Sequence, residues 1–279
     1  MHTKTVSTPQ KFKEQANIDA ETYKRKYDKS LSEPDAFWAE EAATHIAWSK
    51  KWHNVCDSDF TTPQVKWFCG GELNVAHNCT ERHLADKAEK TAIIWEPNNP
   101  DDAATHISFA QLHEEVGRFA NTLKSLGVTK GTKVCLYMPM IPEAAYAMLA
   151  CARLGAVHSV VFAGFSAEAL ASRIDDATCD VVITADEGKR GDKTIPLKQT
   201  VDDATAKTTH PVQHVLTVRY TGADVPFNAP RNVWRDVWYH DAAAQQPDHC
   251  PAEPMEANDP LFILYTSGST GKPKGVVHG

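Results

Sequence analysis

Short apolar runs alternate with amphipathic stretches along the chain from Thr91 onward. Short runs rich in β-branched and aromatic residues are typical of buried strands, and apolar residues at helical spacing are typical of helices. This alternation predicts an α/β fold in which helices cover mostly parallel sheets. The expected strands span 92–95, 106–109, 133–138, 156–162, 180–184, 214–218 and 260–265, and the expected helices span 109–126, 143–154, 166–177 and 233–244.

Local signals support several helix boundaries. Gly127 and Gly155 each follow an apolar-periodic stretch, and glycine at that place readily takes the left-handed conformation that ends a helix. Ser166 precedes another such stretch, where its hydroxyl can accept a hydrogen bond from the first turn, and Glu168 adds a favourable negative charge there. These residues predict where the helices in this part of the chain begin or end.

The N-terminal part of the chain has a different character. Residues 1–30 are polar and rich in lysine, and they are expected to form an N-terminal arm. A helix is expected from Pro34, within a segment whose tryptophans we interpret as packing anchors of a cap rather than as catalytic groups. Four of the seven tryptophans precede residue 70, namely Trp38, Trp48, Trp52 and Trp67.

A loop rich in glycine, hydroxyl groups and lysine follows the apolar run 260–265. It reads Tyr-Thr-Ser-Gly-Ser-Thr-Gly-Lys-Pro-Lys-Gly over residues 265–275. Glycines let the backbone approach a ligand, and hydroxyls and lysines hold phosphate oxygens, so the loop has the parts of a polyphosphate site at a strand end. A flexible Ser/Gly linker is the less favoured alternative, because linkers rarely follow a buried strand.

The loop differs from a P-loop. That motif needs a wider spacing between its glycines than Gly268 and Gly271 provide, since these enclose only two residues. Pro273 has no N–H and biases Lys272 away from helical angles, so a helix N-terminus is not expected there. Because residues 275–278 are again strand-like, the pattern predicts a strand, a loop and a second strand.

Two further segments lie at predicted strand ends. Residues 162–166 join a strand to a helix start, where N–H groups attract anions, although ordinary turn chemistry explains the same residues. Residues 185–193 concentrate three basic groups and two glycines, and a solvated charged loop is the competing interpretation. The residues alone leave both alternatives open.

Composition and charge narrow the class of protein. The chain has 279 residues, of which 42% are hydrophobic and 23% charged, as in an ordinary globular protein. A net charge of -7 argues against a general nucleic-acid or membrane surface.

The 7 cysteines and 13 histidines lack the spacing of metal ligands, so no protein-bound metal is expected, and Cys79 is expected to be buried and inert. The start of the chain does not resemble a secretion signal, which makes a cytoplasmic location the expectation.

The string 265–275 resembles the signature loop of the adenylate-forming superfamily, which contains AMP-forming acyl-CoA synthetases, luciferases and peptide-synthetase adenylation domains. The resemblance implies that the loop holds the β- and γ-phosphates of ATP, bound with Mg²⁺, while a carboxylate attacks the α-phosphate and pyrophosphate leaves. Lys272 is implied as the catalytic residue that neutralises this leaving group. The implied phosphate-binding residues are Thr266, Ser267, Gly268, Ser269, Thr270, Gly271, Lys272 and Lys274.

The segment 66–84 adds a narrower resemblance. Its Lys-Trp-Phe, Gly-Glu-Leu-Asn, Asn-Cys and Arg-His-Leu groups resemble the N-terminal region of acetyl-CoA synthetases and their propionyl relatives. This implies acetate, ATP and coenzyme A as substrates, with coenzyme A bound at the two strand ends described above. Lys193 stands where an arginine is expected, and Asp192 where a small residue is usual. The implied coenzyme A residues are Phe162, Ala163, Gly164, Arg190, Gly191, Asp192 and Lys193.

The resemblance also divides the chain. It implies a polar arm over 1–30, an acetyl-CoA synthetase N-terminal segment over 31–84 and an AMP-binding domain over 85–279. The family's adenine and ribose motifs, acyl pocket, magnesium ligand and C-terminal domain follow the phosphate loop, so we expect an N-terminal fragment that is incomplete at its C-terminus and inactive alone. The alternatives are a propionyl-CoA or other short-chain synthetase and a non-catalytic nucleotide- or CoA-binding module. The oligomeric state stays open.

Overall fold

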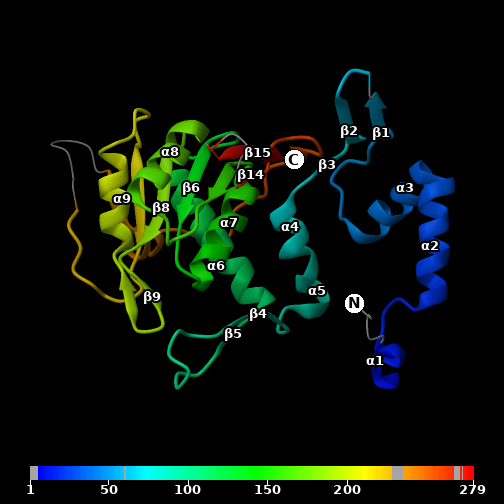
Figure 1. The fold of residues 1–279 in the computed structure, drawn as a ribbon, viewed down its shortest axis with the longest axis horizontal. Helices are drawn as coiled ribbons and strands as arrows, with labels where there is room; N and C mark the ends of the chain where they lie inside the picture. Colours follow the sequence, from blue (N-terminus) through cyan, green and yellow to red (C-terminus); the bar gives the residue numbers. More distant parts are fainter. Residues whose placement is uncertain (1–5, 60, 228–234, 267–270, 272) are drawn as a thin grey trace.

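A seven-stranded sheet organises the fold (Figure 1). The computed structural model describes residues 6–59, 61–227, 235–266, 271 and 273–279. Neighbouring strands of the sheet are parallel, except that β14 and β15 are antiparallel, so the predicted α/β fold with a mostly parallel sheet is confirmed. In sheet order the strands are β12 (Asp236–Trp238), β11 (His214–Val218), β8 (Val181–Ala185), β6 (Lys133–Tyr137), β7 (Val157–Val160), β14 (Phe262–Thr266) and β15 (Lys274–His278).

Helices cover both faces of the sheet. The chain runs from β6 to β7 on one side and then crosses back to β8 on the other side of β6. Because parallel crossovers are right-handed, this reversal puts the connecting helices on opposite faces. Accordingly α7 packs on α6 and α10 on α6, whereas α8 packs on α9. The helices are α6 (Phe109–Ser125), α7 (Pro142–Leu154), α8 (Ala167–Ala177), α9 (Leu197–Thr205) and α10 (Tyr239–Ala243).

The predicted helix ends are confirmed. Gly155 follows α7 directly with a φ of 67°, the left-handed conformation that lets the backbone leave the helix. Gly127 takes a φ of 84° just beyond the end of α6. At the start of α8 the hydroxyl of Ser166 accepts a hydrogen bond from the backbone N–H of Ala169 at 3.3 Å. Local side-chain and backbone chemistry therefore sets these boundaries.

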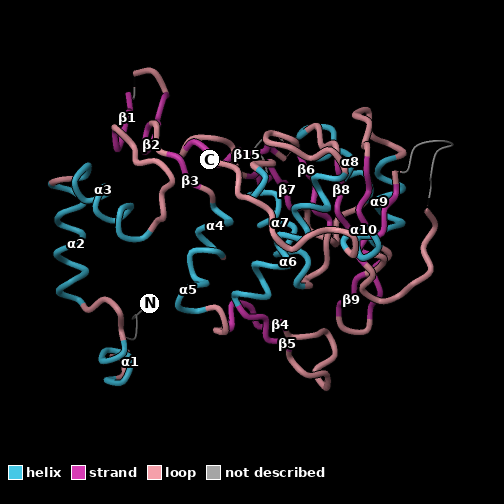
Figure 2. The backbone as a smooth tube through the Cα atoms, turned by 180° about the vertical axis from the view of Figure 1, so that it is seen from behind, coloured by secondary structure: helices cyan, strands magenta, loops and turns pink. Residues whose placement is uncertain are grey.

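The N-terminal elements lie beside the sheet domain, and the view from behind shows the same separation (Figures 1 and 2). Helices α1 and α2 bury no side chain, and α2 is held to α3 by Lys26 and Glu41, whose charged atoms lie 2.7 Å apart. The elements of this part are α1 (Gln10–Gln15), α2 (Ala20–Ser32), α3 (Pro34–His45), β1 (Asn54–Asp59), β2 (Gln64–Cys69), β3 (Glu72–Leu73), α4 (Val75–Cys79), the 3-10 helix η1 (Glu81–His83) and α5 (Leu84–Lys87). Four short antiparallel pairs complete the described fold: β1 with β2, β4 (Thr91–Trp95) with β5 (Thr105–Ser108), β9 (Gly188–Arg190) with β10 (Lys193–Ile195), and β13 (Met255–Glu256) with β3.

The tryptophans of the N-terminal segment pack on other aromatic rings. Trp48 and Trp52 meet edge to face with their ring centroids 4.8 Å apart, and both contact Phe68. Trp38 meets Trp67 in the same way at 6.2 Å. This arrangement agrees with their interpretation as packing anchors.

Asn74 joins the N-terminal segment to the sheet domain. Its side-chain nitrogen donates to the backbone oxygens of Ala152 at 2.9 Å and Glu253 at 2.8 Å, and the residue is 6% exposed. Beside it, the fully buried Arg153 places Nη2 3.2 Å from Oε2 of Glu81. Asn74 links the start of α4 to the end of α7, and Glu81 links η1 to the same end of α7. Buried polar bonds therefore fix the position of the N-terminal segment.

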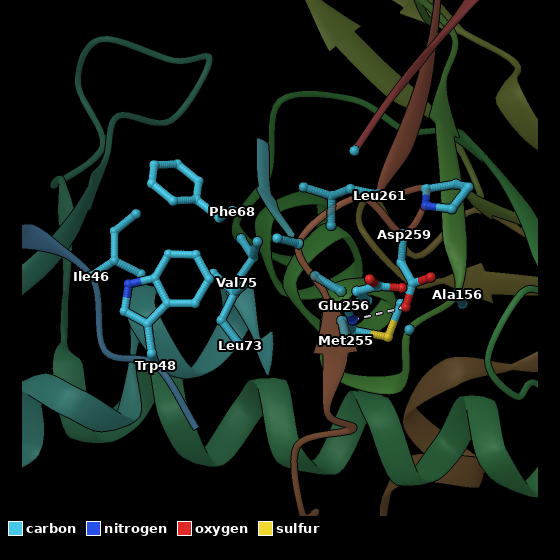
Figure 3. Close-up of a pocket in the computed structure, with 15 residues that line it drawn as sticks. Ile46, Trp48, Phe68, Leu73, Val75, Ala156, Met255, Glu256, Asp259 and Leu261 are labelled. Carbon is cyan, nitrogen blue, oxygen red and sulfur yellow. Dashed lines mark hydrogen bonds between the residues drawn. The ribbon is translucent and has the colours of Figure 1, made fainter. Parts of the chain in front are cut away.

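A cavity of about 200 Å³ lies at the same junction (Figure 3). Trp48, Phe68 and Leu73 line it from the N-terminal segment, and Met255 and Leu261 line it from the sheet domain. The lining is mainly apolar, so the two parts meet through a hydrophobic contact that is not completely filled. None of the predicted site residues is among the described residues that line it.

The predicted helix over 233–244 is wrong in its first half. Residues 233 and 234 lie outside the described part of the chain; within that part, Asp236–Trp238 forms β12, which pairs in parallel with β11, and only Tyr239–Ala243 is helical. Asp236 is 2% exposed and lies 3.6 Å from the ammonium group of the fully buried Lys198 on α9. These contacts join residues that are far apart in the sequence, and they override the local helical pattern.

Two expectations about burial are also wrong. The run 260–265 forms β14, but Leu264 is 44% exposed, because β14 lies next to the edge strand and meets β7 at only two residue pairs. Cys79 is exposed rather than buried, since it is the last residue of the short helix α4 at the surface. Desolvation around its thiol nevertheless raises the pKa of Cys79, which keeps it in the unreactive protonated form.

A buried histidine makes the stability of the fold depend on pH. His158 on β7 is 8% exposed, and its Nδ1 has no hydrogen-bond partner among the described residues. Burial lowers the pKa of its imidazole to about 4. The unfolded chain, in which histidine titrates near about 6.5, therefore binds more protons than the folded protein between these pH values. The contribution of His158 to stability is complete above about pH 6.5, and about 3 kcal/mol is lost as the pH falls towards 4.

We expect urea unfolding to show a lower free energy at about pH 5 than at about pH 7.5, and the His158→Gln variant to lose less over this range. The exposed His106 on β5 provides the control, because His106→Gln should keep the wild-type pH dependence. If the free energy of unfolding falls equally in the wild type and in His158→Gln between the two pH values, His158 is not the source of the pH dependence.

Candidate functional site

The carboxyl ends of β6, β7 and β8 surround a cavity of about 410 Å³. In a parallel sheet these ends meet at one edge, and the edge where the strand order reverses is where open α/β sheets bind ligands. Apolar groups from residues 138–141 and 160–164 form part of the wall. Lys189, Arg190 and Tyr220 add polar groups to it. Glu96 adds one carboxylate, so the cavity combines an apolar surface with two basic groups and one acidic group.

The turn after β7 is held by a buried tyrosine. Tyr137, which is 1% exposed at the end of β6, points its hydroxyl at the carbonyl oxygens of Ala163 and Phe165, at 3.1 and 2.7 Å. A Cβ atom at Gly164 would lie 2.4 Å from the ring of Phe162, so the close approach of that ring requires glycine. Phe162 is 57% exposed. The turn thus presents an aromatic ring at the cavity.

The charged segment 185–193 contains the β9–β10 hairpin rather than an irregular loop. Gly191 at its tip has a φ of 56°, donates its N–H to Asn98 Oδ1 at 2.8 Å and accepts from Asn98 Nδ2 at 3.0 Å. These bonds fix the direction of the hairpin. As a result, the guanidinium carbon of Arg190 lies 6.0 Å from the ring centroid of Phe162.

The seven predicted coenzyme A residues fall into two groups. Gly191, Asp192 and Lys193 occupy the tip and the second strand of the hairpin and do not line the cavity. Lys193 is the register partner of Arg190, so its backbone lies beside the cavity wall. The residues that line the cavity are Phe162, Ala163, Gly164 and Arg190.

Asp186 is a residue of this site that the sequence analysis did not single out. It follows β8 directly, is 1% exposed, and accepts hydrogen bonds from the backbone N–H groups of Tyr220 at 2.9 Å and Gly222 at 2.8 Å. Its carboxylate therefore fixes the loop that carries Tyr220 into the cavity wall. An acidic residue at a strand end was the only signal in the sequence. Further N–H groups that donate to Asp186 belong to Glu187, Thr221 and Ala223.

The ends of the predicted phosphate loop lie side by side. Thr266 ends β14, Lys274 begins β15, and the two residues are partners in the antiparallel register. Gly271 within the loop has a φ of 88°, which favours glycine. The other predicted phosphate-binding residues lie outside the described residues, namely Ser267, Gly268, Ser269, Thr270 and Lys272.

The register of β14 with β7 relates the loop to the cavity. Phe262 pairs with His158 in parallel, and the next residues pair in the same way. Thr266 follows Phe262 along the chain by the same number of residues as Phe162 follows His158. Since parallel strands advance together, the loop and the turn begin at the same level of the sheet edge.

Comparison with known proteins identifies the family. Residues 80–279 match the AMP-binding enzyme family. The chain belongs to this family. Residues 23–79 match a second family, described as the acetyl-coenzyme A synthetase N-terminus. The sheet, the cavity and the predicted phosphate loop all lie in the part that matches AMP-binding enzymes.

Several curated relatives are similar over nearly the whole chain. It is 54% identical over 270 residues to acetyl-coenzyme A synthetase 2 of Pseudomonas aeruginosa, an alignment that covers 97% of this chain and 41% of the relative. It is 50% identical over 276 residues to acetyl-coenzyme A synthetase of Alkalilimnicola ehrlichii, covering 99% of this chain and 42% of the relative. The chain therefore spans about two fifths of the length of these relatives.

Two features are absent from the described residues. These residues contain no group of three or more histidine, cysteine, aspartate or glutamate side chains placed to hold a metal ion. None of the helices in the described ranges has the length and apolar character needed to cross a membrane.

We expect Asp186→Asn to lower the free energy of unfolding by about 2 kcal/mol or more, because an amide NH₂ would then face backbone N–H groups that have lost their acceptor. Urea unfolding of the variant gives the measurement. Asp192→Asn is the control, because this exposed hairpin residue should change stability by less than about 0.5 kcal/mol. A similarly small effect at both positions would show that the Asp186 bonds do not hold the loop.

Proposed function

We propose that this chain supplies the coenzyme A cavity and the phosphate loop of an AMP-forming acetate–CoA ligase. The observation that carries the proposal is the register of β7 with β14, which sets the turn at Phe162 and the loop at Thr266 on one sheet edge. Membership of the AMP-binding enzyme family and the match to the acetyl-coenzyme A synthetase N-terminus support it.

The proposed reaction has two steps. Acetate attacks the α-phosphate of ATP, which gives acetyl-adenylate and releases pyrophosphate. The thiol of coenzyme A then attacks the carbonyl carbon of the adenylate, and AMP leaves as acetyl-CoA forms. Charge builds on phosphate oxygens in both steps, so the protein must place positive charge and N–H donors around them in advance.

Coenzyme A is assigned to the cavity at the ends of β6, β7 and β8. This ligand carries phosphates and an aromatic base, and the cavity offers a partner for each. The exposed ring of Phe162 can stack on the base, and Lys189 and Arg190 can pair with a phosphate. Since Arg190 lies close to the same ring, one part of the ligand can contact both residues.

The loop that starts at Thr266 is assigned to the β- and γ-phosphates of ATP. Lys272 and Lys274 supply positive charge to the leaving pyrophosphate, and the hydroxyl groups of the loop supply donors. Mg²⁺ is assigned to ATP itself, because this ion commonly binds nucleotides through the phosphate oxygens and keeps several waters. No residue of this chain is assigned to the ion.

We expect coenzyme A to bind the purified chain saturably, and Arg190→Ala to weaken that binding about tenfold or more, because a charge-assisted bond to phosphate is lost. Isothermal titration calorimetry gives both dissociation constants. Arg25→Ala is the matched control, since Arg25 is exposed on α2 far from the cavity, and it should bind like the wild type. If Arg190→Ala binds coenzyme A as tightly as the wild type does, the assignment of coenzyme A to this cavity is refuted.

We expect Mg-ATP to bind the chain and pyrophosphate to compete with it, whereas AMP, which lacks the β- and γ-phosphates, competes far less. Lys272→Ala should weaken Mg-ATP binding about tenfold or more, since a cation beside the polyphosphate is removed. Lys11→Ala, in the exposed helix α1, is the control and should have no effect. Equal competition by AMP and pyrophosphate would count against a loop that recognises the β- and γ-phosphates.

A further inference from the structure

We infer that Arg173, Asp176 and Tyr265 form a clamp that sets the position of the phosphate loop relative to the turn at 162–166. The inference rests on the proposed function, because it assigns positioning residues to the two sites proposed there. Arg173 and Asp176 belong to α8, and Tyr265 belongs to β14, next to the first residue of the loop. The three residues are called the α8 clamp below.

The first contact of the α8 clamp joins β14 to α8. The hydroxyl of Tyr265 donates to Oδ2 of Asp176 at 2.7 Å. Burial and this hydrogen bond raise the pKa of Tyr265, so the hydroxyl keeps its proton and remains a donor at neutral pH. The bond fixes the end of β14 against the last turn of the helix.

The second contact joins both ends of the loop. Tyr265 and Gly275 are partners in the antiparallel register, and a Cβ atom at Gly275 would lie 3.3 Å from two carbon atoms of the tyrosine ring. The ring therefore lies across the backbone of Gly275. Because Gly275 follows Lys274 directly, one side chain contacts the strand that enters the loop and the strand that leaves it. A larger residue at 275 would have to displace the ring.

The third contact joins the clamp to the turn. The guanidinium carbon of Arg173 lies 4.6 Å from the ring centroid of Phe165 and 5.3 Å from that of Tyr265. Its Nη1 donates to the backbone oxygen of Ala169 at 2.7 Å, which sets the direction of the side chain. Arginine suits this place because its flat cation can contact two aromatic faces, whereas lysine carries a point charge.

The turn is itself fixed to the sheet. The carbonyl oxygen of Phe165 accepts the hydroxyl of Tyr137, so Phe165 gives Arg173 a rigid surface. A continuous series of contacts thus runs from β6 through the turn and α8 to β14 and β15. The turn can therefore move relative to the ends of the loop only if one of these contacts breaks. The role assigned to Arg173 and Tyr265 is to position the segments that contact the proposed ligands.

Two conservative variants test the α8 clamp. Tyr265→Phe keeps the ring on Gly275 but removes the bond to Asp176, and it should weaken Mg-ATP binding about fivefold or more while coenzyme A binding stays within about twofold. Arg173→Lys keeps the charge but loses the flat contact with both rings, so it should weaken both ligands. Tyr27→Phe and Arg25→Lys on the exposed helix α2 are the matched controls. The urea unfolding midpoint of each variant shows whether the effect is separate from a general loss of stability.

Amide hydrogen exchange in the ligand-free protein gives a readout that does not depend on the proposed function. We expect faster exchange in β14 and β15 in both variants, with β6 and β8 unchanged. Unchanged exchange in β14 and β15 overturns the clamp, whether or not the wild type binds ligands. If the wild type binds Mg-ATP, and the variants show faster exchange but bind Mg-ATP as tightly as the wild type, the clamp residues are merely structural. That result also overturns the inference. If the wild type binds neither ligand, the proposed function fails, while faster exchange still supports the clamp on the loop.

Discussion

The short parallel pairing between β7 and β14 is the constraint on which the site depends. Among the described residues, two register pairs cross this boundary, Phe262 with His158 and Ile263 with Ser159, yet they join two segments about a hundred residues apart in sequence. One side of the boundary carries the turn at Phe162, and the other carries the loop that begins at Thr266. A slip by one residue would turn every side chain of β14 to the opposite face, and Tyr265 would then point away from α8.

The boundary is supported from the side by the N-terminal segment. Arg153, at the end of the helix that precedes β7, is completely buried, and its Nε donates to the backbone oxygen of Cys250 while Nη2 faces Glu81. A buried guanidinium is costly unless its charge and its donors are compensated. Here Glu81 of η1 supplies the opposite charge and the chain that leads to β14 supplies an acceptor, whereas Nη1 has no hydrogen-bond partner among the described residues. The N-terminal segment therefore contributes to the geometry of the sheet domain as well as covering it.

The sequence was sufficient to predict those parts of the structure that depend on residues close together along the chain. Gly155 and Ser166 act within one helical turn, and the buried strand β6 is visible as an uninterrupted apolar run, so each could be predicted from a few letters. The turn at 162–164 and Arg190 could be singled out by resemblance, but only the fold shows that Asn98 aims the hairpin at that turn.

The errors have the opposite origin. Asp186 and Asp236 resemble ordinary surface charges in the sequence, yet Asp186 receives N–H groups from a loop more than thirty residues away and Asp236 faces the buried Lys198. Burial of such groups depends on partners that no local pattern contains. The same reason explains why β12 was predicted as helix, since the strand that it pairs with, β11, ends well before it in the sequence.

The bonds of Asp186 also have a kinetic consequence. Its negative charge faces backbone N–H dipoles inside the protein, so it does little to neutralise Lys189 and Arg190 on the neighbouring hairpin. The chain as a whole carries a net charge of -7 and repels polyanions at long range. At the cavity, Lys189 and Arg190 share the wall with one carboxylate, that of Glu96, and these charges act mainly within about one Debye length, which is about 8 Å at physiological ionic strength. The local positive charge is therefore short-ranged against the net negative charge of the chain, which makes the rate of encounter between an anion and the cavity sensitive to salt.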